Sequence, residues 1–150
     1  MTDDMVVDKS IAGMRRFQEI LRKMPPQSAE IVTGSVAIEK EVKLILQEKF
    51  VNPGHLDKLK AIHAISVLEA STTDDWMLQV LAAASAFIEL RNTVAHSNVS
   101  NFDTNNTKLL DAMEQIGDRP DPGTMQYGSI AIAIITALHL AFGEETISTV

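Results

Sequence analysis

The sequence predicts an all-α protein, an antiparallel bundle of five to six helices in a single domain over residues 1–150. Aromatic residues make up only 5% of the chain, whereas aliphatic residues and seven Met supply most of its hydrophobic content. Apolar residues recur at the three- and four-residue spacing of helices along most of the chain, and no strand-like alternation competes with them. The length suffices for one sizeable core, and no repeat, linker or low-complexity tract divides it.

Three helices are expected in the first half of the chain. Asp8 is a favourable N-cap for a helix over 8–24, which Pro25-Pro26 stops. A second helix is expected over 28–50 and a third over about 55–70, because apolar residues recur at helical spacing in both.

The fourth helix, over 74–96, is the clearest prediction. One apolar seam steps by four and three residues through Trp76, Val80, Ala83, Phe87, Leu90 and Val94. An adjacent seam contains Met77, Leu81, Ala84 and Ile88, and then reaches Arg91. A helix that buries two adjacent seams lies at the centre of its bundle. The polar run over 71–75 supplies N-capping residues for it.

A polar, Asn-rich loop is expected over 97–106, followed by a short helix that ends at Gly117 and a last helix over 124–142. The apolar run in the last helix is too short to span a bilayer. The N-terminus also lacks the basic region and apolar core of a signal peptide. We therefore expect a cytoplasmic protein without a membrane partner.

Charge is distributed unevenly. The net charge of −7 argues against general nucleic-acid binding, which requires Lys and Arg to displace counterions. Residues 1–60 nevertheless hold ten cations and nine acids, whereas residues 61–150 hold three and eleven. In the first helix a single acid, Glu19, lies among five cations: Lys9, Arg15, Arg16, Arg22 and Lys23. This run is either a phosphate-contacting patch or a solvated helix face with cations at its C-terminal end.

Several chemistries find no support. The absence of Cys excludes thiol catalysis, disulfides and Cys-based zinc sites. No His-x-x-x-His pair, Gly-rich phosphate loop or nucleophile elbow occurs, and we expect neither a metal nor a cofactor. His63 and His139 are expected to be core residues with hydrogen-bond partners, and His55 a turn residue.

The end of the fourth helix gathers Glu89, Arg91, Asn92 and His96 within eight residues. At about 100° per residue, Glu89, Asn92 and His96 share one stripe, whereas Arg91 lies about 140° from His96. One interpretation is a structural clamp: Arg91 pairs with a buried acid, Asn92 ties down the following loop, and His96 is a favourable cation at a helix C-terminus. The other is a functional site, closed by the long Arg side chain or by a second copy of the chain.

The segment over 87–97, Phe-Ile-Glu-Leu-Arg-Asn-Thr-Val-Ala-His-Ser, resembles the signature of the HEPN superfamily of small all-α prokaryotic domains. That signature is an Arg, a polar residue that is commonly Asn, Asp or His, and a His four to six residues after the Arg. Arg91, Asn92 and His96 match it with four residues between Arg and His. The helix order before the segment is also similar to that superfamily and to its relatives among mannitol-operon regulators.

The resemblance implies a metal-independent endoribonuclease of the toxin or stress-effector type, acting as a homodimer. In such proteins two Arg–His pairs face one cleft, and a ribose 2′-hydroxyl attacks the neighbouring phosphate. His96 would then be the general base or acid, and Arg91 would hold the phosphate and stabilise its developing charge. Asn92 would orient His96 or the phosphate, and Glu89 would tune the imidazole. An RNA substrate and a cognate antitoxin are the implied partners.

Two alternatives remain open. Many members of the superfamily bind or regulate instead of cleaving, so the chain is alternatively a non-catalytic HEPN-like regulator or adaptor for a protein partner. A ligand-binding bundle is the third interpretation. Only the Met-rich composition favours it, and Met is ordinarily gap-filling core material.

Overall fold

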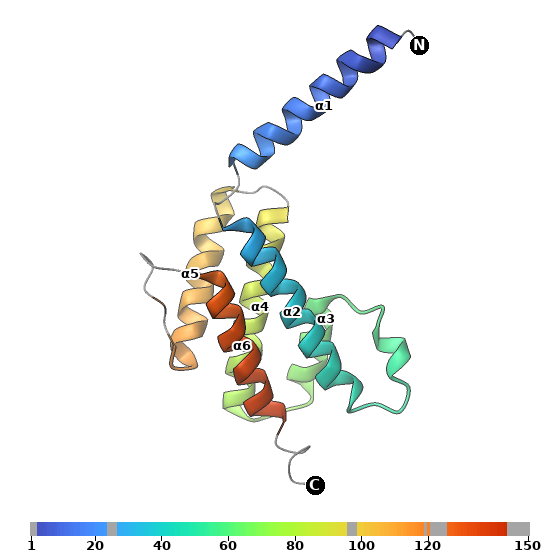
Figure 1. Cartoon of the computed structure of the whole chain (residues 1–150). Helices are drawn as coiled ribbons and strands as arrows, with labels where there is room; N and C mark the ends of the chain where they lie inside the picture. Colours follow the sequence, from blue (N-terminus) through green and yellow to red (C-terminus); the bar gives the residue numbers. More distant parts are fainter. Residues whose placement is uncertain (1–2, 24–26, 96–98, 119, 121–125, 144–150) are drawn as a thin grey trace.

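The computed structural model describes residues 3–23, 27–95, 99–118, 120 and 126–143. Within these residues every regular element is helical, so the all-α prediction is confirmed. In order along the chain (Figure 1), the elements are α1 (Asp3–Lys23), α2 (Ser28–Gln47), the 3-10 helix η1 (Pro53–Leu56), α3 (Ala61–Ala70), α4 (Asp75–Ala95), α5 (Val99–Gln115) and α6 (Tyr127–Phe142).

The long helix α4 is the centre of the bundle, as its two apolar seams predicted. It packs against α2, α3, α5 and α6. Both seams are buried along most of their length, from Val80 and Leu81 to Val94. Trp76 is the exception with 39% exposure, because it lies in the first turn of α4, at the edge of the packed region.

Helices α2 and α6 run parallel to each other (Figure 1). Gly34 of α2 lies against Ala131 of α6, and seven residues further along α2 Glu41 contacts His139 of α6. A Cβ atom on Gly34 would lie 2.8 Å from Cζ of Phe87 and 2.9 Å from Cβ of Ala131. The missing side chain therefore allows α2, α4 and α6 to meet at one point.

The prediction of a polar loop over 97–106 is wrong from residue 99 onward, because α5 already begins at Val99. Tertiary contacts hold this Asn-rich turn in a helix that its intrinsic propensity disfavours. Phe102 packs against the core, Asn105 donates a hydrogen bond to Thr93, and Asn106 accepts one from Tyr127. The prediction that this helix ends at Gly117 is confirmed. Gly117 has a φ of +88°, and the N–H of Asp118 donates a hydrogen bond to the backbone O of Met113 at 2.9 Å.

Other predicted boundaries also move. The first helix begins at Asp3, so Asp8 lies inside it and is not its cap. The helix expected over 55–70 divides into η1 and α3. Leu56, the last residue of η1, and Leu59, in the turn that follows, both pack against the core. The second helix ends at Gln47, three residues earlier than expected.

The predictions for two histidines need correction as well. His63 and His139 are exposed, so neither is a core residue. His139 has a partner nonetheless: its Nε2 lies 3.0 Å from Oε2 of Glu41, across the junction of α6 and α2.

Helix α1 stands apart from the bundle. It leaves the end of the bundle where α2 begins, and the N-terminus lies far from the core (Figure 1). Its large apolar residues that the structure describes are exposed. None of the described helices is both long and apolar enough to cross a lipid bilayer.

Candidate functional site at the end of α4

Arg91 and Asn92 form the described part of the candidate site, in the last turns of α4. Both are half-buried. The seam that Arg91 continues is buried up to Ile88, so Arg91 lies at the edge of the buried part of this seam. Its Nη1 donates a hydrogen bond to Oδ1 of Asn92 at 3.4 Å. The long side chain thus covers the roughly 100° of helix surface between the two positions.

The guanidinium of Arg91 has no carboxylate partner among the residues that the structure describes. Glu89, the nearest acid in sequence, is exposed on another part of the helix. The clamp interpretation required a buried acid beside Arg91, and the described core contains no buried acid. Asn92 is hydrogen-bonded to Arg91 and, within the described part of the chain, to no group of α5.

His96 lies outside the described residues, directly after the last residue of α4. The structure therefore brings together Arg91 and Asn92, places Glu89 on the exposed surface of the same helix, and does not describe where the imidazole lies. The expected Arg91–His96 pair stays a prediction.

Thr93 holds the end of α4 to α5, a role that the sequence analysis did not assign. This side chain is buried, and its hydroxyl donates to the backbone O of Glu89 at 3.1 Å. The same hydroxyl accepts a hydrogen bond from the side-chain amide of Asn105 on α5. A polar residue inside an apolar seam is the signal that would have identified it, because a buried hydroxyl needs partners. The joint fixes the turn of α4 that carries Arg91 and Asn92.

A second polar contact anchors the other side of α5. The Tyr127 hydroxyl donates a hydrogen bond to Oδ1 of Asn106 at 2.8 Å. Burial, with a further contribution from the negative charge of Asp103, raises the pKa of the Tyr127 hydroxyl from 10.0 to about 12. Two consecutive residues of α5 therefore form hydrogen bonds to its neighbours: Asn105 to α4 and Asn106 to α6.

Within the described ranges, no three His, Asp or Glu side chains gather closely enough to hold a metal ion. No protein-family model, no curated protein and no solved structure matches the chain. The structure itself defines the class of protein: an α-helical bundle whose central helix ends in a partly exposed Arg–Asn pair, with an amphipathic helix standing outside the bundle.

Proposed function

We propose that the chain is a HEPN-like, metal-independent endoribonuclease that acts as a homodimer. The observation that carries the proposal is the guanidinium of the half-buried Arg91, which no described carboxylate neutralises. A guanidinium presents a planar fork of donors that fits phosphate oxygens, and it remains charged at any physiological pH. Asn92 orients this fork through the 3.4 Å hydrogen bond.

The proposed reaction is an attack of the ribose 2′-hydroxyl on the adjacent phosphorus. His96 accepts the proton of the 2′-hydroxyl, and the 5′-oxygen departs after protonation by a second acid, for which the partner's copy of His96 is the candidate. Arg91 stabilises the charge that develops on the phosphorane oxygens. The products are a 2′,3′-cyclic phosphate and a 5′-hydroxyl.

The acidic bundle does not attract RNA, and the cations of α1 are the candidate track for the phosphate backbone. Residues 61–150 contain eleven acids and three cations, whereas Arg15, Arg16 and Arg22 are exposed on α1. Helix α1 leaves the bundle at the end where α4 terminates (Figure 1), and Arg91 lies in the last turns of α4, so this track begins at the same end of the bundle.

Cleavage of a labelled RNA in EDTA tests the proposal. We expect the wild-type protein to yield 2′,3′-cyclic phosphate ends, and His96→Ala to yield none. Arg91→Ala should lower the rate by about 100-fold or more, the usual cost of removing one donor to an oxyanion. Lys58→Ala, which removes an exposed cation outside α1 and α4, is the matched control and should cleave at the wild-type rate. Equal cleavage by wild type and His96→Ala would refute the proposal.

The second candidate is a non-catalytic regulator or adaptor that binds a protein partner. The exposed apolar side chains of α1 favour it, since such a stripe is typical of an interaction surface. It predicts no cleavage by the parent protein and a loss of stability or of assembly in Arg91→Ala. A fully stable Arg91→Ala variant with unchanged assembly would count against it.

A further inference from the structure

Four of the exposed apolar side chains of α1 lie on one side of the helix and have no described partner. At about 100° per residue, Val6, Val7, Met14 and Phe17 fall within one half of the helix, Ile11 lies at the edge of that half, and Met5 lies among the charged residues of the other half. The described charged side chains fall in the other half: Asp4, Asp8, Lys9, Arg15, Arg16, Glu19 and Arg22. Met14 is 63% exposed and Phe17 is 61% exposed. Most of the stability of a helix in a protein comes from the packing of its apolar face, so the apolar face of α1 needs a partner.

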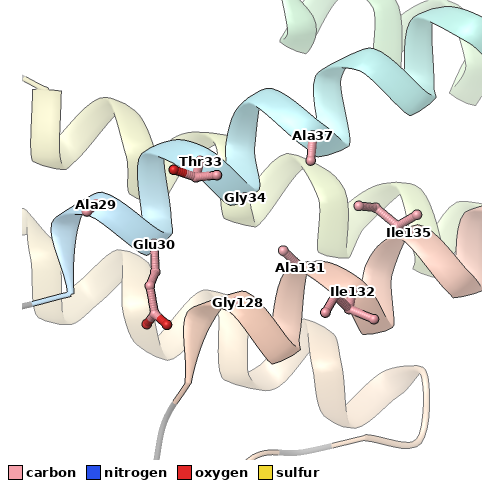
Figure 2. Close-up of a pocket in the computed structure, with 9 residues that line it drawn as sticks. All are labelled: Ala29, Glu30, Thr33, Gly34, Ala37, Gly128, Ala131, Ile132 and Ile135. Carbon is pink, nitrogen blue, oxygen red and sulfur yellow. The ribbon is translucent and has the colours of Figure 1, made fainter.

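A groove of complementary character runs between α2 and α6 (Figure 2). It has a volume of about 360 Å³. Small and aliphatic residues form nearly all of its lining: Ala29, Thr33, Gly34, Ala37, Gly128, Ala131, Ile132 and Ile135. Glu30, at its mouth, is the charged residue of the lining, and Ile132 on its rim is 66% exposed. Short side chains on both walls allow the backbone of another helix to approach closely.

We propose that this groove receives the apolar face of α1 from a second copy of the chain, and that two copies exchange their first helices reciprocally. An amphipathic helix that lays its apolar side into a groove is a common mode of recognition. Here the chain supplies both halves of the interaction, because the described part of α1 makes no substantial contact with α2 or α6 of its own copy.

The length of the groove limits the area of the exchange. A helix of 21 residues is about 31 Å long and about 10 Å wide, so half of its surface is roughly 500 Å². The lining of the groove extends over residues 29–37 of α2 and 128–135 of α6, about 12 Å, so it receives about 200 Å² of this face. Two such contacts bury about 800 Å² in total, the area of a weak association, and a single docking buries about half of that.

Charge favours the same pairing. The sequence of α1 contains five cations and four acids, a net charge of +1, whereas the rest of the chain contains eight cations and sixteen acids, a net charge of −8. The apolar face of α1 enters the groove while its charged half stays in water. Each copy has a net charge of −7, so a contact between α1 and the bundle avoids the repulsion that two bundle surfaces meet when they face each other.

The direction of α1 favours exchange between copies over folding back within one copy. Helix α1 points away from its own groove and extends beyond the end of the bundle where α4 terminates (Figure 1). A second copy stacked end to end on that surface, related by a two-fold axis, has its groove beside the projecting α1. This arrangement also brings the two α4 ends to the same interface. The exchange is tested by the mass of the protein in solution and by cross-linking, and neither measurement depends on RNA cleavage.

The mass of the full-length protein is the first test. We expect sedimentation velocity to give a dimer of the 16.4 kDa chain. Phe17→Glu on α1 and Ile132→Glu on the groove should each raise the dimer dissociation constant by about 100-fold or more, since each places a charge in the buried interface of both copies. Val51→Glu makes the same change at a site that is 95% exposed and should leave the constant unchanged. All three variants should keep the circular dichroism spectrum of the wild type.

Cross-linking identifies the occupant of the groove. The chain has no Cys, so an engineered thiol is unique. A mixture of Phe17→Cys chains and differently tagged Ile132→Cys chains should give a mixed cross-linked pair with a short bismaleimide. A cross-link within one Phe17→Cys/Ile132→Cys chain and none between chains would show folding back, and would overturn the proposal. A monomer at all concentrations, Phe17–Phe17 cross-links alone, or binding of the monomer to anionic vesicles would overturn it equally.

Discussion

At the scale of single residues, a few side chains decide how closely the helices approach. Gly34 is the clearest case, because the ring of Phe87 and the methyl group of Ala131 occupy the space of its missing Cβ. Gly128, also helical, is different: a Cβ there would meet only Oε1 of Glu30, at an ordinary 3.6 Å. The two glycines therefore respond differently to the same substitution.

We expect Gly34→Ala to destabilise the fold by about 1–3 kcal/mol, because overpacking of a tight junction outweighs the gain in helix propensity. Gly128→Ala should be neutral or stabilise by up to about 1 kcal/mol, since it gains propensity without a clash. Urea unfolding of both variants measures the difference. Equal effects of the two substitutions would show that the three-helix junction is not close-packed at Gly34.

Because of Tyr127, the free energy of unfolding is expected to depend on pH in the alkaline range. The folded-state pKa of Tyr127 is raised to about 12 from 10.0, so the neutral phenol is favoured in the folded protein. The stability that this contributes is fully present below pH 10 and is lost as the pH rises from 10 towards 12. We expect Tyr127→Phe to be less stable than wild type at pH 8, because it loses the hydrogen bond to Asn106, with the difference narrowing above pH 10. Unfolding curves at pH 8, 10 and 11.5 test this, and a constant difference would contradict it.

At the scale of helices, α5 shows how neighbours override local preference. The Asn-rich start of α5 lacks the composition of a strong helix, yet Thr93 on one side and Tyr127 on the other hold it through Asn105 and Asn106. The start of α4 is specified locally instead. Asp74 accepts a hydrogen bond from the N–H of Met77 at 3.0 Å, the geometry of an N-cap.

The α4–α5 joint is expected to depend on the hydroxyl of Thr93 and not on its shape. Thr93→Val keeps the volume but leaves the amide of Asn105 without its acceptor, at a cost of about 1–3 kcal/mol. Thr93→Ser keeps the hydroxyl and should cost less. Thermal unfolding compares the two. Equal losses would assign the effect to packing of the methyl group.

At the scale of the whole molecule, the packed bundle and α1 have separate roles. The core lies among α2, α3, α4, α5 and α6, with Phe87 fully buried at its centre, and α1 adds no substantial packing to it. Among the described residues, the α2–α6 groove and one side of α1 are apolar surfaces that this arrangement leaves open. Stability of one copy therefore resides in the bundle, and association is the expected role of α1.

We expect Phe87→Ala to cost about 3–5 kcal/mol, the usual loss for a buried aromatic residue. Phe17→Ala removes the same side chain from the exposed face of α1, and should leave the unfolding free energy of the monomer unchanged within about 0.5 kcal/mol. Measurement at protein concentrations below the dimer dissociation constant separates folding from association. A large loss in Phe17→Ala under those conditions would mean that α1 belongs to the core of its own chain.

The sequence by itself determined the all-α class and the central position of α4, since periodicity of apolar residues depends only on local helix geometry. It also singled out Arg91 and Asn92, because a charged residue that interrupts an apolar seam can be recognised from the spacing of residues in the sequence. Tertiary structure alone decided that α5 extends back to Val99, that α2 and α6 run parallel, and that α1 has no place in its own bundle. These depend on contacts between residues distant in sequence, such as Asn105 with Thr93 and Gly34 with Ala131, which local periodicity does not encode.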